Sequence, residues 1–376
     1  MLHWQYSTQL PMNVNTSPKS LPKVAVCILN YNGHQANYLQ QFLPTVYASE
    51  YANLDIYVID NKSTDDSVAY LQKEGFVALN TPTENNRFLI ALDQNYWFAG
   101  GYNHGLKDID ADYFVLLNSD VAVSPNWITP IIELMEKDQQ IAACQPKIKL
   151  FANPVLFEHA GGSGGFVDKW GYPFCRGRIF NSLETDTGQY ENTQPIFWAS
   201  GAAFFIRAKL YYDIGGLDAD YKAHMEEIDL CWRLQRANYK IMVCPQSVVH
   251  HVGGGTLPKE NPHKTYLNFK NSLTTIFKNE TGLKMYWIIW VRLVLDGVAA
   301  TRFLTKGEFG NIGAVIKAHW SFFFSFFNNL KKQKETTQQI AAAQFPSKKQ
   351  VVTPQKYAKS IVWQHFVKGK QKYSEL

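Results

Sequence analysis

The sequence predicts an α/β fold in which helices flank a mostly parallel central sheet. Four apolar runs in the first 120 residues have the length and composition of strands buried on both faces. Helical segments separate these runs, and such alternation is typical of parallel sheets with crossover helices. The runs occupy 23–29, 54–59, 88–92 and 113–117, with helices expected near 36–49 and 66–74 and a turn leading into a helix at 100–106.

The following part of the chain continues this pattern less regularly. A helix is expected at 125–137 and a strand at 141–148, before a stretch of loops and short strands at 151–195 that is rich in glycine and aromatic residues. The last expected elements of this part are a strand within 198–206, a helix that opens within 221–233 and a strand at 239–244.

Composition excludes several classes of protein. The chain has 376 residues, of which 46% are hydrophobic and 18% charged, so it can bury a core. Five cysteines without a C-x-x-C pair indicate reduced thiols rather than a disulfide scaffold. We expect neither a signal peptide in the first 20 residues nor a clean transmembrane helix, because every apolar stretch of 18 residues contains a charge. Phosphate-binding loops of the G-x-x-x-x-G-K-[ST] and G-x-G-x-x-G types are also disfavoured.

The C-terminal part has a different character. Two very apolar, aromatic helices are expected at 285–300 and 319–327, and the segment 331–376 then carries ten lysines against two glutamates. Apolar helices beside a basic segment predict a module that binds a membrane surface. The alternative is that these helices pack on the body of the protein and that the tail is only solvated.

Polar side chains follow three of the predicted strands at the point where each strand ends. They are Asn30 and Asn32 after the first run, Asp60 and Asn61 after the second, and Asn118, Ser119 and Asp120 after the fourth. Ligands bind beyond the carboxyl ends of parallel strands, so these residues predict a ligand site. A carboxylate such as Asp120 suits a hard divalent cation, Mg²⁺ or Mn²⁺, together with a diphosphate.

A second acidic cluster lies at a predicted helix start. Glu226, Glu227 and Asp229 fall within four residues, where the helix dipole stabilises ionised carboxylates. An ionised carboxylate in a cleft can act as a general base toward a hydroxyl group, although capping of the helix is the alternative role. His251 precedes a glycine-rich turn and is a candidate metal ligand.

Together these motifs resemble glycosyltransferase family 2 enzymes with the GT-A fold, in particular the rhamnosyltransferase-like branch. The resemblance covers residues 23–279, and its specificity lies in the order of seven motifs that are weak individually. They are N-Y-N-G, V-I-D-N-K-S-T-D-D-S, N-Y-W-F-A-G-G-Y-N-H-G, V-L-L-N-S-D, W-A-S-G-A, E-E-I-D-L-C-W-R and V-V-H-H-V-G-G-G-T.

The resemblance implies a nucleotide-diphosphate sugar donor, a divalent metal and inversion at the anomeric carbon. It places Asn30, Tyr31, Asn32, Asp60 and Asn61 by the base and ribose, Asn95, Gly100, Gly101 and Asn103 along the donor, and Asn118, Ser119 and Asp120 at the metal triad. Tyr96-Trp97 departs from the family's x-G at this loop. Asp120 and His251 are the implied metal ligands.

The family's E-D-x-D-L motif appears here as Glu226-Glu227-Ile228-Asp229-Leu230, so Glu227 takes the position of the catalytic base. The longer side chain changes the reach of the carboxylate by about 1.5 Å, and Glu226 therefore stays a second candidate. Trp198, Ser200 and Gly201 are expected on the acceptor side, and Trp170 is either a sugar-stacking or a structural residue.

The hypothesis is an inverting transferase that adds one sugar, with dTDP-L-rhamnose as one possible donor, to a cell-surface glycan or lipid-linked precursor. We expect it to be cytoplasmic and peripheral at the inner face of the cell membrane, with no nucleic-acid partner. Its parts would be an arm (1–21), a catalytic domain (22–280, with a donor half at 22–120 and an acceptor half at 121–280), a helical module (281–330) and a basic tail (331–376). A processive synthase is disfavoured because Q-x-x-R-W and several membrane spans are lacking, and a non-catalytic nucleotide-sugar-binding scaffold remains the alternative.

Overall fold

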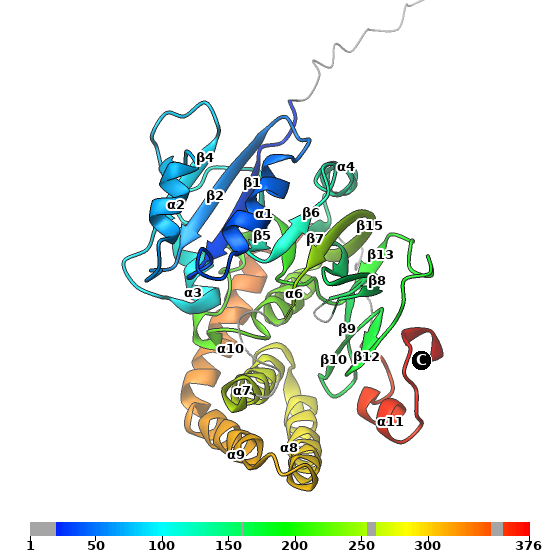
Figure 1. The fold of residues 1–376 in the computed structure, drawn as a ribbon. Helices are drawn as coiled ribbons and strands as arrows, with labels where there is room; N and C mark the ends of the chain where they lie inside the picture. The colour runs from blue at the N-terminus through cyan, green and yellow to red at the C-terminus, as the bar shows by residue number, and fades with distance from the viewer. Residues whose placement is uncertain (1–19, 159–160, 254–260, 347–355) are drawn as a thin grey trace, which may run out of the picture.

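A mixed sheet forms the centre of the protein in the computed structural model, which describes residues 20–158, 161–253, 261–346 and 356–376 (Figure 1). The predicted arm and the glycines at 254–255 lie almost wholly outside these ranges. The main sheet has the order β13-β15-β7-β14-β5-β1-β2-β4-β3, with β6 paired to β15 and β8 to β7. Its strands are β1 (Val24–Asn30), β2 (Leu54–Asp60), β3 (Val77–Ala78), β4 (Arg87–Ala91), β5 (Tyr113–Asn118), β6 (Val121–Val123), β7 (Ile141–Leu150), β8 (Asn153–Phe157), β13 (Gln194–Ile196), β14 (Ala203–Arg207) and β15 (Lys240–His251).

The N-terminal half of the sheet is parallel, as predicted. β5, β1, β2, β4 and β3 all pair in parallel. β14 runs antiparallel to both β5 and β7, and β13, β6 and β8 also pair antiparallel with their neighbours, so the sheet is mixed. β15 was predicted to end near residue 244 but continues to His251 through a bulge. This extension carries His251 to the edge where β5 ends.

Helices cover both faces of the sheet because residues along each buried strand point alternately to two hydrophobic cores. Ala25 and Cys27 of β1 face one core, while Val24, Val26 and Ile28 face the other. One face is covered by α1 (Tyr38–Tyr47), α2 (Ser67–Lys73) and α4 (Thr129–Lys137), and the other by α3 (Trp97–Gly105), α5 (Ala208–Asp213) and α6 (Glu226–Arg236).

A small antiparallel sheet occupies the predicted region of short strands. It consists of β9 (Gly165–Val167), β10 (Pro173–Cys175), β11 (Arg178–Ile179) and β12 (Ser182–Leu183), in the order β12-β11-β10-β9. A 3-10 turn, η1 (Ala219–Tyr221), lies before α6.

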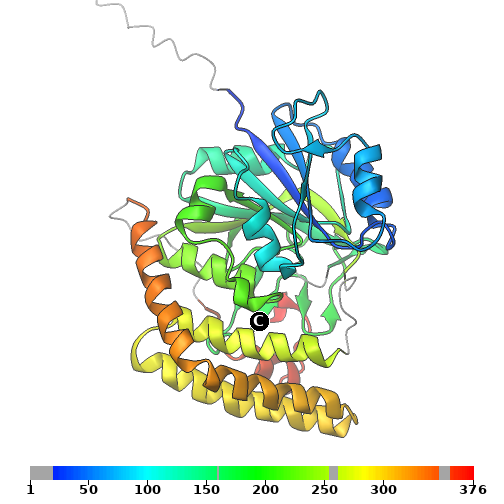
Figure 2. The same cartoon turned by 90° about the vertical axis from the view of Figure 1, so that its left-hand side faces the viewer.

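The C-terminal third is a helical layer packed beneath the carboxyl edge of the sheet. The layer comprises α7 (Pro262–Asn279), α8 (Gly282–Thr305), α9 (Phe309–Phe324) and α10 (Phe326–Ala342). After it, α11 (Ile361–Phe366) and the turn η2 (Tyr373–Glu375) lie beside the small antiparallel sheet. Figure 2 shows α8 and α9 side by side along one edge of the molecule, with α7 between them and the sheet. None of the helices within the described ranges has both the length and the hydropathy that a membrane crossing requires.

The basic segment packs on the body instead of extending from it. The expected boundary between residues 330 and 331 falls inside α10, and Lys332 forms ion pairs with Asp218 and Asp220. Farther along, Ile361 is fully buried and its backbone N–H donates to Asp168 at 2.9 Å. The described part of this segment therefore contacts the body of the protein and is not the solvated tail considered as an alternative.

Candidate active site

The polar residues that end the parallel strands meet at one edge of the sheet. In the strand register Asn30 lies beside Asp60, and Leu29 lies beside Asn118. The arrows of β1 and β2 in Figure 1 point toward α3 at this edge. Register alone therefore brings together three groups that are far apart in the sequence.

The first part of the site is a hydrogen-bonded cradle at the ends of β1 and β2. Asn30 Nδ2 donates to Asp60 Oδ1 at 2.9 Å and to Ser63 Oγ at 3.1 Å. The backbone N–H of Asn32 also donates to Ser63 Oγ, and Asn32 Oδ1 accepts from the N–H of Thr64. Asn30 Oδ1 is buried without a hydrogen-bond partner, and Tyr31 beside it is half exposed. The cradle thus holds its own shape and has an exposed aromatic ring, that of Tyr31, beside it.

Asn61 ties this cradle to the loop before α3. Its Nδ2 donates to Asn95 Oδ1 and to the carbonyl of Trp97, while its Oδ1 accepts from the N–H of Tyr96. Trp97 has a left-handed φ of 61°, which a bulky residue rarely adopts. This is the position where the family pattern has glycine, so the departure noted in the sequence places a half-exposed indole on strained backbone beside the cradle.

Three further predicted donor residues, Gly100, Gly101 and Asn103, make packing contacts or hydrogen bonds within the protein. A side chain at Gly101 would lie 2.7 Å from Leu29 Cδ1, and one at Gly100 would lie 3.1 Å from Tyr96 Cβ, so both glycines permit close packing of α3. Asn103 faces away from the cradle. Its amide donates to the carbonyl of Leu217 at 2.7 Å, and its oxygen accepts from Leu217 N–H and Tyr211 Oη.

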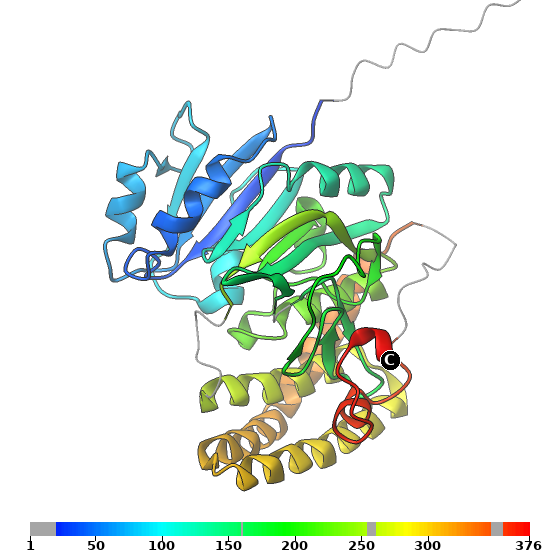
Figure 3. The same ribbon diagram turned by 45° about the vertical axis from the view of Figure 1, so that its right-hand side comes forward.

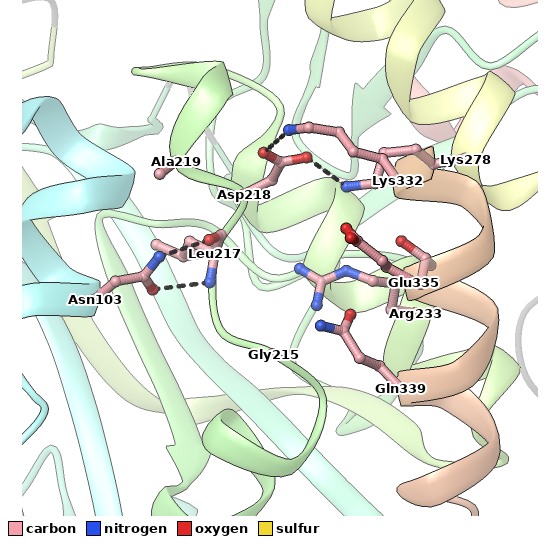
Figure 4. Close-up of a pocket in the computed structure, with 11 residues that line it drawn as sticks. Asn103, Gly215, Leu217, Asp218, Ala219, Arg233, Lys278, Lys332, Glu335 and Gln339 are labelled. Atoms are coloured by element: carbon pink, nitrogen blue, oxygen red, sulfur yellow. Dashed lines mark hydrogen bonds and ion pairs between the residues drawn. The ribbon is translucent and has the colours of Figure 1, made fainter. Parts of the chain in front are cut away.

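Asn103 lines a separate cavity of about 210 Å³ between α3, α6 and α10 (Figure 4). In its wall Asp218 forms ion pairs with both Lys278 of α7 and Lys332 of α10. These contacts hold α10 and α7 against the η1 loop. The cavity therefore lies apart from the strand ends at which the ligand site was predicted.

Asp120 and His251 form the predicted metal pair. His251 Nε2 lies 3.1 Å from Asp120 Oδ1, and His251 Nδ1 lies 3.4 Å from Glu158 Oε1. Burial alone would lower the pKa of His251, but Asp120 and Glu158 raise that pKa to about 10. Two carboxylates thus create a strongly negative potential around one imidazole.

These donor atoms fit a divalent cation. A carboxylate oxygen and an imidazole nitrogen are suitable ligands for Mn²⁺, and two of them converge here. Among the described residues no group of three or more His, Cys, Asp or Glu side chains forms a metal site. Two protein ligands leave most coordination positions of a divalent cation open, and the phosphates of a substrate could fill some of these positions.

Glu226 and Glu227 open α6 on the other side of the site. Glu226 is buried and Glu227 partly exposed, and one oxygen of each, Oε2, has no hydrogen-bond partner. Burial raises the pKa of Glu227 to about 7, and burial together with the charge of Glu227 raises the pKa of Glu226 well above its usual range. Carboxyls in this state are poised to exchange protons near neutral pH.

Cys175 feels carboxylates from both acidic clusters. Burial, and after it the charges of Glu158 and Glu227, raise the pKa of the Cys175 thiol. Glu158 contacts the metal pair, and Glu227 is the predicted base.

A strained loop positions the base. Lys222, His224 and Met225 have φ angles of 62°, 70° and 76°, although none of them is glycine. Asn271 of α7 holds this loop, because its Nδ2 lies 2.9–3.0 Å from the carbonyls of Tyr221, Ala223 and His224. Such strain persists where the surrounding structure fixes it, most often at functional sites.

Asp229 is not available for proton transfer. It is fully buried, its Oδ2 accepts from Arg233 and Lys278, and its Oδ1 accepts from Asn279. Burial would raise the pKa of Asp229, but these cations lower it. The carboxylate instead joins α6 to α7.

The residues expected on the acceptor side are mostly internal. The Trp198 indole is buried, donates to the carbonyl of Phe166 and packs on Gly165. Ser200 is buried too, and its N–H bonds to Gln145. Gly201 alone of the three is partly exposed, close to the Phe98 ring. Trp170 packs with the core of the C-terminal helices.

Glu158 and Asn271 were missed in the sequence. Glu158 follows β8 in a region predicted only as short strands, and a lone glutamate there gives no signal. Asn271 lies in a helix that was not predicted at all. Both act through contacts between segments distant in the chain, which local patterns do not contain.

A sheet with nucleotide-type polar turns at its carboxyl edge, a carboxylate–imidazole pair and an acidic helix start defines a transferase of the GT-A fold. The profile of glycosyl transferase family 2 matches residues 25–215. The chain belongs to glycosyl transferase family 2.

Two relatives and one solved structure agree with this assignment. An N-acetylglucosaminyl-diphospho-decaprenol L-rhamnosyltransferase of Mycobacterium tuberculosis is 23% identical over 277 residues, covering 70% of this chain and 87% of the relative. An uncharacterized glycosyltransferase of Haemophilus influenzae is 27% identical over 125 residues, covering 33% of this chain and 36% of the relative. The crystal structure of GalNAc-T7 with UDP, GalNAc and Mn²⁺ superposes with a TM-score of 0.53 at 15% identity, covering 69% of this chain and 48% of that chain.

The chain thus spans about a third of the Haemophilus relative and about half of the GalNAc-T7 chain. The predicted fold and the predicted likeness to rhamnosyltransferases are confirmed.

Proposed function

We propose that the protein is an inverting, metal-dependent glycosyltransferase that moves one sugar from a nucleotide-diphosphate donor to an acceptor hydroxyl. The observation that carries this proposal is the pair of glutamates at the start of α6, each with one buried carboxylate oxygen that lacks a hydrogen-bond partner, in a chain that also places His251 3.1 Å from Asp120. A base on one side and a metal pair on the other are what a single displacement requires. The name of the mycobacterial relative favours an L-rhamnosyl donor and a lipid-linked acceptor.

The donor would lie along the carboxyl edge of the sheet. Asn30 and Asn32 would contact the base and ribose, with Asp60 fixing Asn30 and with Asn61 holding the adjoining loop through Asn95. Asp120 and His251 would hold a Mg²⁺ or Mn²⁺ ion, which would offset the charge that develops on the leaving diphosphate. Glu158 would orient the His251 ring through Nδ1.

Glu227 would remove the proton from the acceptor hydroxyl. We prefer it to Glu226 because its side chain is partly exposed, and a base must reach its substrate. Attack from the face opposite the leaving group then inverts the anomeric carbon. Asp229 would position α6, and Asn271 would fix the loop that precedes it.

To reach a lipid-linked acceptor, the enzyme would have to bind at the surface of the membrane that holds the acceptor. We accordingly propose that the protein is peripheral at the inner face of the cell membrane. The support for this is the aromatic C-terminal helices, several of whose large apolar side chains are exposed.

The experiment that tests the proposal compares Glu227→Gln with Glu226→Gln. We expect Glu227→Gln to abolish transfer while the thermal shift produced by a nucleotide-sugar donor with Mn²⁺ is retained. Glu133→Gln, an exposed glutamate on α4, is the matched control. Full transfer by Glu227→Gln would overturn the base assignment, and donor binding without turnover in the wild type would favour the non-catalytic scaffold.

A further inference from the structure

The outer surface of the C-terminal layer carries a stripe of large apolar side chains. On α8 these include Leu283, Trp287 and Trp290, and on α9 they include Ile316, Trp320 and Phe324. Their spacing of three or four residues places each set on one side of its helix. We call these six residues the docking face. Leu283 is 86% exposed and Phe324 82%, so the face is open in the protein as it stands.

The fold does not need this face for its own core. The opposite sides of α8 and α9 are already filled, with Ile288 and Ile289 of α8 and Phe322 of α9 packed against α7. An additional apolar surface on helices whose inner sides are buried marks an interaction site. Its indole rings suit a boundary between water and an apolar phase, because they combine apolar area with an N–H donor.

Charge identifies the occupant. The described chain between residues 282 and 327 contains exposed cations at Lys284, Arg302, Lys306 and Lys317. Its acidic residues are Asp296, which is buried, and Glu308, which is near Lys306. An apolar stripe bordered by cations complements a bilayer with anionic headgroups. A second copy of the chain would present the same cations and repel this border.

The sequence indicated a membrane contact through both the apolar C-terminal helices and the basic tail. In the structure Lys332 of the tail is engaged with Asp218 and Asp220, and α10 is packed on the body. Of the two parts of the predicted contact, the exposed helices α8 and α9 are therefore the ones considered for the membrane.

We propose that the docking face inserts into the interfacial layer of an anionic lipid bilayer. This inference rests on the proposed transfer to a lipid-linked acceptor and specifies its partner. Figure 3 shows α7 between the α8–α9 pair and the carboxyl edge of the sheet. Because α7 also holds the base loop through Asn271, a docked protein would keep its base within one helical layer of the lipid surface.

The test measures binding of the full chain to vesicles of phosphatidylglycerol and phosphatidylcholine by co-sedimentation. The variant Ile316→Ser/Phe324→Ser removes apolar area from the docking face and keeps its three tryptophans. We expect it to lower the partition coefficient at least about tenfold. The control Leu21→Ser/Val155→Ser removes two apolar side chains elsewhere that are each more than half exposed, and it should leave binding unchanged.

Insertion has its own readout. Lipids brominated near the headgroup should quench the tryptophan emission of the wild type on binding, and vesicles of phosphatidylcholine alone should bind more weakly. Absence of vesicle binding, or binding that the double substitution leaves unchanged, would overturn the proposal. A dimer in solution that the same substitution disrupts, without vesicle binding, would assign the face to a second copy.

The outcome is separable from that of the proposed reaction. Glu227→Gln should bind vesicles like the wild type, because the docking face does not include the base. A wild-type protein that binds donor and turns over but does not bind vesicles would refute the docking face alone. Vesicle binding without any transfer would refute the reaction alone.

Discussion

Glu227 stands at the position of the general base, and the folded protein raises the pKa of its carboxyl toward neutral pH. Burial raises the pKa of Glu227 to about 7, and burial with the charge of Glu227 also raises the pKa of Glu226, which lies next to it in the chain. A base must be ionised to accept a proton, so the transfer rate should be low at pH 5.5 and rise through a midpoint near pH 7. A pH profile of kcat/KM measures this, and a rate that is flat between pH 5.5 and 8.5 would contradict it.

The same shift predicts the pH dependence of stability. The folded state binds a proton on Glu227 more tightly than the unfolded chain does, so this stabilisation is complete below about pH 4.5 and is lost as the pH rises through about 7. Glu227→Gln removes the penalty of a buried charge. We expect its Tm to exceed that of the wild type at pH 8 and to match it at pH 5, as measured by differential scanning calorimetry.

Glu158 acts on His251 from the side opposite Asp120. Its Oε1 lies 3.4 Å from His251 Nδ1, and a side chain at Gly253 would come within 2.7 Å of the same oxygen. Loss of such an orienting carboxylate weakens metal binding about 10–100-fold. We expect Glu158→Ala to weaken Mn²⁺ binding in this range by titration calorimetry, and Glu158→Gln to recover part of it.

A buried glutamate elsewhere supplies the control for this measurement. Glu184 bonds to Tyr190 and to the backbone of Tyr373, away from the metal pair. Glu184→Gln should therefore leave the affinity for Mn²⁺ unchanged. Equal loss in both variants would show that Glu158 only stabilises the fold.

At the scale of single elements, α7 is the support for the catalytic loop. The amide of Asn271 reaches three carbonyls of a loop in which three non-glycine residues have positive φ. We expect Asn271→Leu to lower kcat at least about tenfold while donor affinity stays within about twofold, because the base is misplaced and the cradle is not.

Asn329→Leu is the matched control for this change. Asn329 is equally buried and also donates to a carbonyl, but it lies on α10 and contacts Phe322. A similar fall in kcat for both variants would mean that stability, not loop position, limits the rate. Hydrogen exchange in residues 221–225 should rise only in Asn271→Leu.

Strands and helices could be predicted where the contiguous residues of one element form a recognisable pattern. The apolar runs of β1, β2, β4 and β5 and the acidic start of α6 are local signals, and register brings Asn30 and Asp60 together as expected for parallel strands. Packing between distant segments was not predictable. It placed Trp198 and Ser200 in the interior, turned Asn103 toward Leu217 and surrounded Asp229 with cations.

At the scale of the whole molecule, the C-terminal third closes around the catalytic body. Two parts of this C-terminal third contact the catalytic body independently. Lys332 of α10 pairs with the η1 loop, and Tyr357 forms a β-bridge to Asp168 beside the small sheet. The segment that composition marked as a basic tail is therefore part of the folded unit, and Ile361 is one of its apolar residues that is buried against the body.

Ile361 gives the sharpest test of this arrangement. Its side chain is fully buried with Phe174 and Ile179 of the small sheet, whereas Trp363 on the same short helix is 54% exposed. Truncating a buried isoleucine costs about 2–5 kcal/mol. We expect Ile361→Ala to lower the free energy of unfolding by about that amount in urea titrations, and Trp363→Ala to change it by less than about 0.5 kcal/mol. Equal and negligible effects would mean that this segment is only solvated in solution.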